Sequence, residues 1–119
     1  MHSTKAQIRK IFLAETKKNI CDIKANITSK DHKNVHKKLR SIAGTAQTMG
    51  MENLGALCAG LADYEEKRSL KDPPKDSSYA LLFEGLTHID FYVSKIEKGL
   101  TGYTEFSGFL AKLEDDAHK

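Results

Sequence analysis

The sequence predicts an all-α protein: an antiparallel up-down four-helix bundle with a short additional C-terminal helix. Three observations predict this class. Apolar residues recur every three or four positions along most of the chain, which is the spacing of an amphipathic helix. Only two prolines occur among the 119 residues, and they are adjacent. No stretch shows the alternation of apolar and polar residues that is typical of a half-buried strand.

Two long helices are predicted in the first half of the chain. The first covers about residues 4–28, with these apolar residues on one face: Ile8, Phe12, Ile20, Ile23 and Ile27. Asp31 is expected to cap the second helix, because its carboxylate can accept hydrogen bonds from the N–H groups of the first turn. Gly50 is expected to end this helix as a glycine just after the C-terminus. The inward face of the second helix is expected to hold Val35, Leu39, Ile42, Ala46 and Met49.

The second half of the chain continues the same pattern. A third helix follows directly, with these inward residues: Met51, Leu54, Leu57, Leu61 and Tyr64. The segment 72–76 contains Pro73 and Pro74 and should interrupt the pattern, because proline lacks an N–H group and its ring obstructs a continuing helix. A fourth helix is expected from Ser77 to about Gly99, with an apolar face of Tyr79, Leu82, Leu86, Ile89, Val93, Ile96 and Leu100. A last short helix is indicated by Tyr103, Phe106, Leu110 and Leu113. We therefore assign residues 1–102 to the bundle and residues 103–119 to a short C-terminal helix or tail.

Composition and motifs exclude several classes of protein. A net charge of +3 is too small to indicate nucleic-acid binding by itself. No run approaches the roughly 20 apolar residues of a membrane span, and the polar N-terminus does not resemble a signal peptide, so a cytoplasmic protein is expected. Cys21 and Cys58 lack a CxxC spacing and are expected to be reduced packing residues. Without a phosphate-binding glycine loop, a nucleophile elbow or a carboxylate pair, neither an independent enzyme nor a cofactor is predicted.

One segment of the second predicted helix carries a more specific signal. Residues 40–50 read Arg-Ser-Ile-Ala-Gly-Thr-Ala-Gln-Thr-Met-Gly. The segment resembles the core of a histidine phosphotransfer (HPt) domain, which reads roughly His-x-Leu/Ile-Lys-Gly-x-Ala-x-x-x-Gly. The matching residues are Ile42, Gly44, Ala46 and Gly50. The resemblance covers about residues 5–100 and includes the stretch from Leu57 to Leu61, although Ala62 departs from the acidic residue that commonly follows there.

Two departures from the family pattern concern its chemistry. Arg40 stands where the family has its phosphorylated histidine, and Ala43 stands where it has a lysine beside the phosphate. A protonated guanidinium has no free lone pair, so Arg40 cannot accept a phosphoryl group. The resemblance therefore implies a bundle that is retained and a phosphotransfer reaction that is lost.

The outward face of the second helix is the predicted partner-binding surface. It carries Lys33, Lys37, Arg40, Gly44 and Gln47, which lie opposite the apolar stripe. Most such basic faces are only solvated. We favour an interface because Gly44, which costs about 1 kcal/mol relative to alanine within a helix, lies in the middle of this face.

Two histidines offer an alternative chemistry. His36 precedes Arg40 by one turn and is expected to be exposed beside it, so it is an alternative phosphoacceptor. It would, however, lie about 6 Å from the position of the family's histidine. His32 and His36 also have the i, i+4 spacing of a helical metal pair. No third ligand follows at a suitable spacing, so surface histidines and no metal site are predicted.

Three functional hypotheses follow. In the first, the chain is a non-phosphorylatable HPt-like module that binds a receiver domain, or a related partner such as a histidine kinase, without relaying phosphate. In the second, it is an active phosphorelay protein that uses His36. In the third, it is a regulatory or dimerising helical domain of a larger signalling protein. The sequence favours the first over the second and separates the first from the third only weakly.

Overall fold

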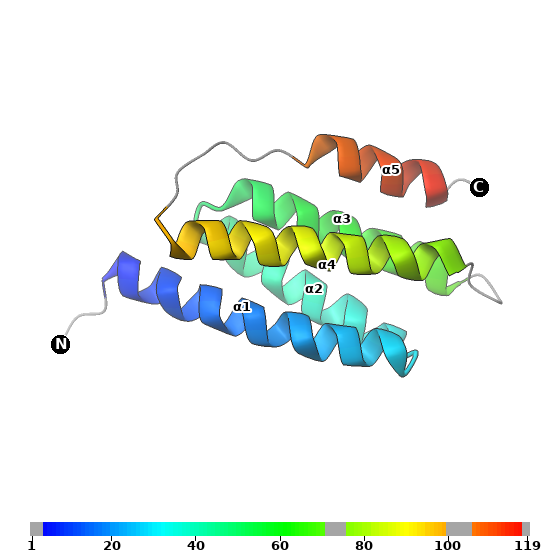
Figure 1. Ribbon diagram of the computed structural model, residues 1–119, viewed down its shortest axis with the longest axis horizontal. Helices are drawn as coiled ribbons and strands as arrows, with labels where there is room; N and C mark the ends of the chain where they lie inside the picture. The colour runs from blue at the N-terminus through cyan, green and yellow to red at the C-terminus, as the bar shows by residue number, and fades with distance from the viewer. Residues whose placement is uncertain (1–3, 71–75, 100–105, 118–119) are drawn as a thin grey trace.

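The computed structural model describes residues 4–70, 76–99 and 106–117 (Figure 1). Within these residues the chain is helical and contains no strand, which confirms the predicted fold class. The five helices are α1 (Lys5–Thr28), α2 (His32–Thr48), α3 (Glu52–Ser69), α4 (Asp76–Glu97) and α5 (Ser107–Ala117). None of the described helices is both long enough and apolar enough to cross a lipid bilayer.

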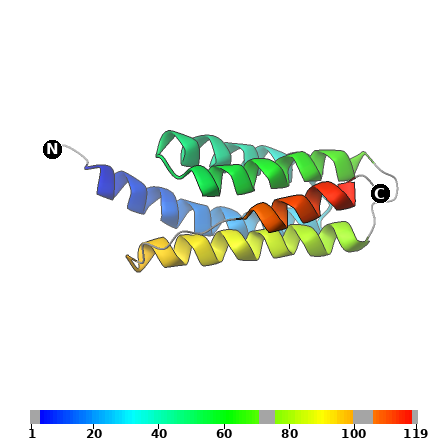
Figure 2. The same ribbon diagram turned by 90° about the horizontal axis from the view of Figure 1, so that it is seen from above.

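The first four helices run up and down alternately, as the short connections predict (Figure 1). The most extensive contact lies between α2 and α3, while α1 and α4 pack on each other and complete the bundle. Helix α5 runs in the same direction as α3 and lies over α3 and α4 (Figures 1 and 2). The candidate site on α2 therefore sits on the most tightly paired part of the molecule.

The ends of the first two helices follow from local chemistry. Thr4 and Gln7 form a capping box, in which each side chain bonds the backbone N–H of the other residue. Asp31 caps α2 as predicted, by accepting a hydrogen bond from the backbone N–H of Asn34. Gly50 has a φ of 78° directly after the helix end, which confirms the predicted glycine stop.

Among the described residues, one hydrophobic core joins all five helices. The buried residues of α2 include four of the five predicted: Val35, Leu39, Ile42 and Ala46. Met49 is only partly buried and lies just after the helix. Ile8 is 47% exposed, so its predicted place on the inward face of α1 is wrong. The reason is geometric: the first turns of α1 extend past the start of α3 and the end of α4 (Figure 2).

Some predicted features lie outside the described residues. These are the proline segment 72–75, Leu100, Tyr103 and the proposed boundary between residues 102 and 103. From the last predicted helix, Phe106 and Leu113 are buried in the common core and Leu110 packs against it.

Candidate functional site

The predicted partner-binding face of α2 is exposed along its whole length. Its residues Lys33, Lys37, Arg40, Gly44 and Gln47 all face solvent to a large extent. A Cβ atom added at Gly44 would meet nothing within 4 Å, so no described part of the bundle requires a glycine there. The open space over Gly44 is the clearance that the interface hypothesis needs.

Arg40 is not free in this structure. Its guanidinium Nη2 donates to Oδ1 of Asp63 on α3 and forms an ion pair across the two helices. The two side chains remain 46% and 54% exposed. An ion pair at this exposure contributes about 0–1 kcal/mol, because water competes for both charges. Arg40 can therefore leave Asp63 for another carboxylate at a small energetic cost.

His36 differs from the exposed imidazole that the sequence predicts. Its ring is half-buried, and Nδ1 lies 3.0 Å from the carbonyl oxygen of Ala62 on α3. Because a carbonyl only accepts hydrogen bonds, Nδ1 must carry the proton in this contact. In the neutral ring the lone pair then belongs to Nε2. The contact fixes the orientation of the ring and makes His36 part of the α2–α3 packing.

His32 has an acidic neighbour that the sequence analysis missed. Its Nδ1 lies 2.5 Å from Oε1 of Glu65, whose side chain is almost completely buried. Burial raises the pKa of the Glu65 carboxyl above its ordinary value, and the hydrogen bond from His32 opposes this effect only in part. A possible third ligand, Glu65, thus lies beside His32, although the sequence spacing indicated none. Even so, no three His, Cys, Asp or Glu residues of the described chain are placed to hold a metal ion.

Gln47 has a structural contact as well as an exposed surface. A Cβ atom added at Gly55 of α3 would lie 2.6 Å from Cγ of Gln47 and 3.2 Å from the carbonyl oxygen of Ala43. Gly55 thus lets α3 approach α2 closely, with the stem of Gln47 resting against it. This contact gives Gln47 a packing role, whereas no described residue would touch a Cβ atom at Gly44.

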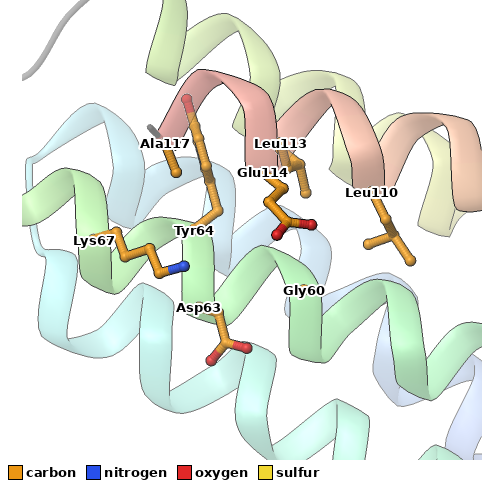
Figure 3. Close-up of a pocket in the computed structure, with 8 residues that line it drawn as sticks. All are labelled: Gly60, Asp63, Tyr64, Lys67, Leu110, Leu113, Glu114 and Ala117. Carbon is orange, nitrogen blue, oxygen red and sulfur yellow. The ribbon is translucent and has the colours of Figure 1, made fainter. Parts of the chain in front are cut away.

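A groove between α3 and α5 has Asp63, the partner of Arg40, among its lining residues (Figure 3). Its volume is about 290 Å³, and Asp63, Lys67 and Glu114 supply its charged side chains. Figure 3 shows that Asp63 points away from α5, toward α2, whereas Glu114 points from α5 toward α3. Asp63 therefore belongs to the α2–α3 face more than to the groove.

Polar contacts contribute to the packing of α5 against α3. The Tyr64 hydroxyl donates to Oδ2 of Asp116 at 2.6 Å, and the same carboxylate lies 3.7 Å from Nε of the buried Arg68. These contacts tie the C-terminal part of α5 to α3, and α5 does not pack against α2. The position of α5 thus does not block access to Arg40 or Gly44.

No family model matches the chain, and no curated protein or solved structure matches it significantly. The face carries Arg40 in an exposed ion pair, an open glycine one turn further along α2, and a half-buried imidazole held by a backbone carbonyl. In chemical terms, Arg40 can exchange one carboxylate for another, and the space beside Gly44 is open.

Proposed function

We propose that this protein is a non-phosphorylatable HPt-like module, which binds a receiver domain or a related two-component partner without relaying phosphate. The observation that carries the proposal is that Arg40 and Gly44 lie on the same exposed face of α2, with open space over Gly44. Arg40 cannot be phosphorylated, and it stands at the position where HPt domains, which the sequence resembles, have their phosphoacceptor histidine. The glycine leaves room for a partner's backbone beside it.

The proposed binding step is an exchange of carboxylates. In the free protein Arg40 pairs with Asp63, and on binding it turns to an acidic group in the partner's phosphorylation pocket. Breaking the exposed pair costs about 0–1 kcal/mol. A guanidinium that becomes buried against a carboxylate makes a stronger, charge-assisted contact, so the exchange can be favourable overall. The module would then occupy the receiver and exclude its true phosphodonors.

The test is calorimetry against a panel of receiver domains from the same organism. Arg40→Ala should weaken binding at least tenfold, since truncating a buried, paired charge costs about 2–5 kcal/mol, and Arg40→Glu should abolish it. Lys33→Ala is the matched control, because this exposed residue lies two turns away and should change affinity only slightly. Asp63→Ala removes the competing carboxylate, so it should leave binding unchanged or strengthen it. Equal affinities of the wild type and Arg40→Glu for a receiver that binds would contradict the proposal.

A second candidate function rests on the contact between His36 and Ala62. A ring held through Nδ1 presents Nε2 as the nucleophile in its neutral form, so His36 is a candidate phosphoacceptor. Half-burial of the ring counts against this candidate. Incubation with labelled phospho-receiver distinguishes the two functions. Acid-labile, base-stable label that reaches stoichiometry and is lost in His36→Ala would favour the relay, whereas no label on the wild type would favour the binding module.

A further inference from the structure

The N-terminal part of α1 is a helix that the bundle leaves uncovered. Every residue from Thr4 to Ile11 is exposed, and burial of α1 begins only at Phe12. Two isoleucines project from this segment: Ile8 is 47% exposed and Ile11 is 57% exposed. Isolated exposed apolar residues are common on protein surfaces, so these two exposures alone decide nothing.

A groove lies beside Ile8 and makes this segment a candidate binding surface. It has a volume of about 640 Å³ and lies between the first turns of α1 and the end of α2. Its residues are Lys5, Ala6, Ile8, Arg9, Thr48, Met49 and Gly50. Ile8 and the partly buried Met49 supply its apolar surface, Lys5 and Arg9 supply its charge, and Ile11 lies outside it. An amphipathic helix can place a row of apolar side chains into a groove of this kind.

The charged residues around the groove indicate which class of partner can bind there. Lys5, Arg9 and Lys10 lie on this segment, and residues 4–14 contain no acidic residue. None of the three cations is ion-paired with a described residue. A second copy of the chain would bring the same three cations against each other in a twofold interface, which disfavours self-association. A flat anionic membrane would satisfy the charges but could not fill a groove between two helices.

We propose that this groove binds an acidic amphipathic helix of a partner protein. Apolar residues of that helix, spaced three or four apart, enter between Ile8 and Met49. Acidic residues on its flanks meet Lys5 and Arg9. The inference is independent of the receiver-binding function proposed above, because Arg40 takes no part in it.

The test uses a fluorescein-labelled peptide with leucines at i, i+4 and i+7, glutamates at the positions that flank this apolar stripe, and alanines elsewhere to favour the helix. The control peptide keeps the leucines and replaces each glutamate by lysine. Fluorescence anisotropy should show binding of the acidic peptide and at least about tenfold weaker binding of the basic one. The affinity of the acidic peptide should fall as salt is raised, since the flanking contacts are exposed.

Two isoleucine variants provide the decisive comparison. Ile8→Ser should weaken binding about tenfold or more, because a contact inside the groove is lost. Ile11→Ser is the matched control: Ile11 is more exposed but lies outside the groove, so its change should matter little. Neither change should lower the melting temperature appreciably, because both side chains are already exposed. Arg40→Glu should leave peptide affinity unchanged, which separates this site from the α2 face.

Several results would overturn the proposal. Equal affinity for the acidic and basic peptides would mean that the charges of Lys5 and Arg9 do not select the partner. Equal effects of the two isoleucine variants would mean that the peptide does not bind in the groove. Stronger binding to phosphatidylserine–phosphatidylcholine vesicles than to the peptide would identify the segment as a membrane-surface helix. A dimer seen by sedimentation and dissolved by Ile8→Ser would assign the groove to a second copy of the chain.

Discussion

Replacing Gly44 by alanine tests whether the glycine serves the helix or a partner. In the free protein the new methyl group would meet nothing within 4 Å, so it introduces no clash. Alanine is favoured over glycine within a helix by about 1 kcal/mol. We therefore expect Gly44→Ala to raise the free energy of unfolding by about 0.5–1 kcal/mol, as compatible glycine-to-alanine changes do.

Gly85→Ala is the matched comparison on α4. A Cβ atom there would lie 2.4 Å, 2.7 Å and 3.0 Å from Cδ2, Cδ1 and Cγ of the buried Leu61. Overpacking of this kind costs about 1–3 kcal/mol, which outweighs the gain in helix propensity at all but the lower end of that range. The same substitution should thus have opposite effects at the two glycines.

The assay is urea denaturation followed by circular dichroism at 222 nm, a wavelength that reports helix, with all three proteins in one buffer. The expected order of stability is Gly44→Ala, then wild type, then Gly85→Ala. A Gly44→Ala protein that is less stable than the wild type by 1 kcal/mol or more would mean that Gly44 is required by the fold. The proposed interface on α2 would then lose its main structural support.

Three further predictions concern the core and its titrating groups. Leu39→Ala and Leu86→Ala should each lower the free energy of unfolding by about 2–5 kcal/mol in urea titrations, because both side chains are fully buried, and smaller losses would mean a loosely packed core. Burial raises the pKa of Glu65 in the folded protein, so its contribution to stability should be fully present at pH values below the ordinary 4.5 and should be lost as pH rises through the folded pKa. The free energy of unfolding of the wild type should therefore fall relative to that of Glu65→Gln as the pH rises through the folded pKa. A difference between the two proteins that does not change with pH would contradict a raised pKa of Glu65. Burial also raises the pKa of Cys58 to about 12, so iodoacetamide at neutral pH should modify Cys21 in the native protein and Cys58 only in urea, as mass spectrometry can show.

Local patterns in the sequence were sufficient to predict the helices and most of the core. The three- and four-residue spacing identified the buried face of α2, and Asp31 and Gly50 marked its ends because caps depend on residues close in the chain. The failure at Ile8 has a different origin. Periodicity says which residues share a face of a helix, but not how far the neighbouring helices extend along it.

The candidate site was only partly predictable. The exposure of Arg40 followed from its position opposite the apolar stripe of α2, but its ion pair with Asp63 depends on the register between two helices, which spacing within one helix does not determine. Glu65 could have been found. It lies four residues after the buried Leu61, so it continues the inward stripe of α3 and marks a buried carboxylate that needs a partner.

The close pairing of α2 with α3 also bears on how the chain folds. The two helices are adjacent in sequence, are joined by a short turn, and make the most extensive contact in the molecule. Closing a short loop loses less entropy than bringing distant segments together, so we expect this hairpin to form early and to dominate the folding transition state. Arg40, His36 and their partners all lie within the hairpin. Partial openings that detach α1 or α5 should therefore leave the candidate site assembled, and amide hydrogens of α2 and α3 should exchange more slowly than those of α5.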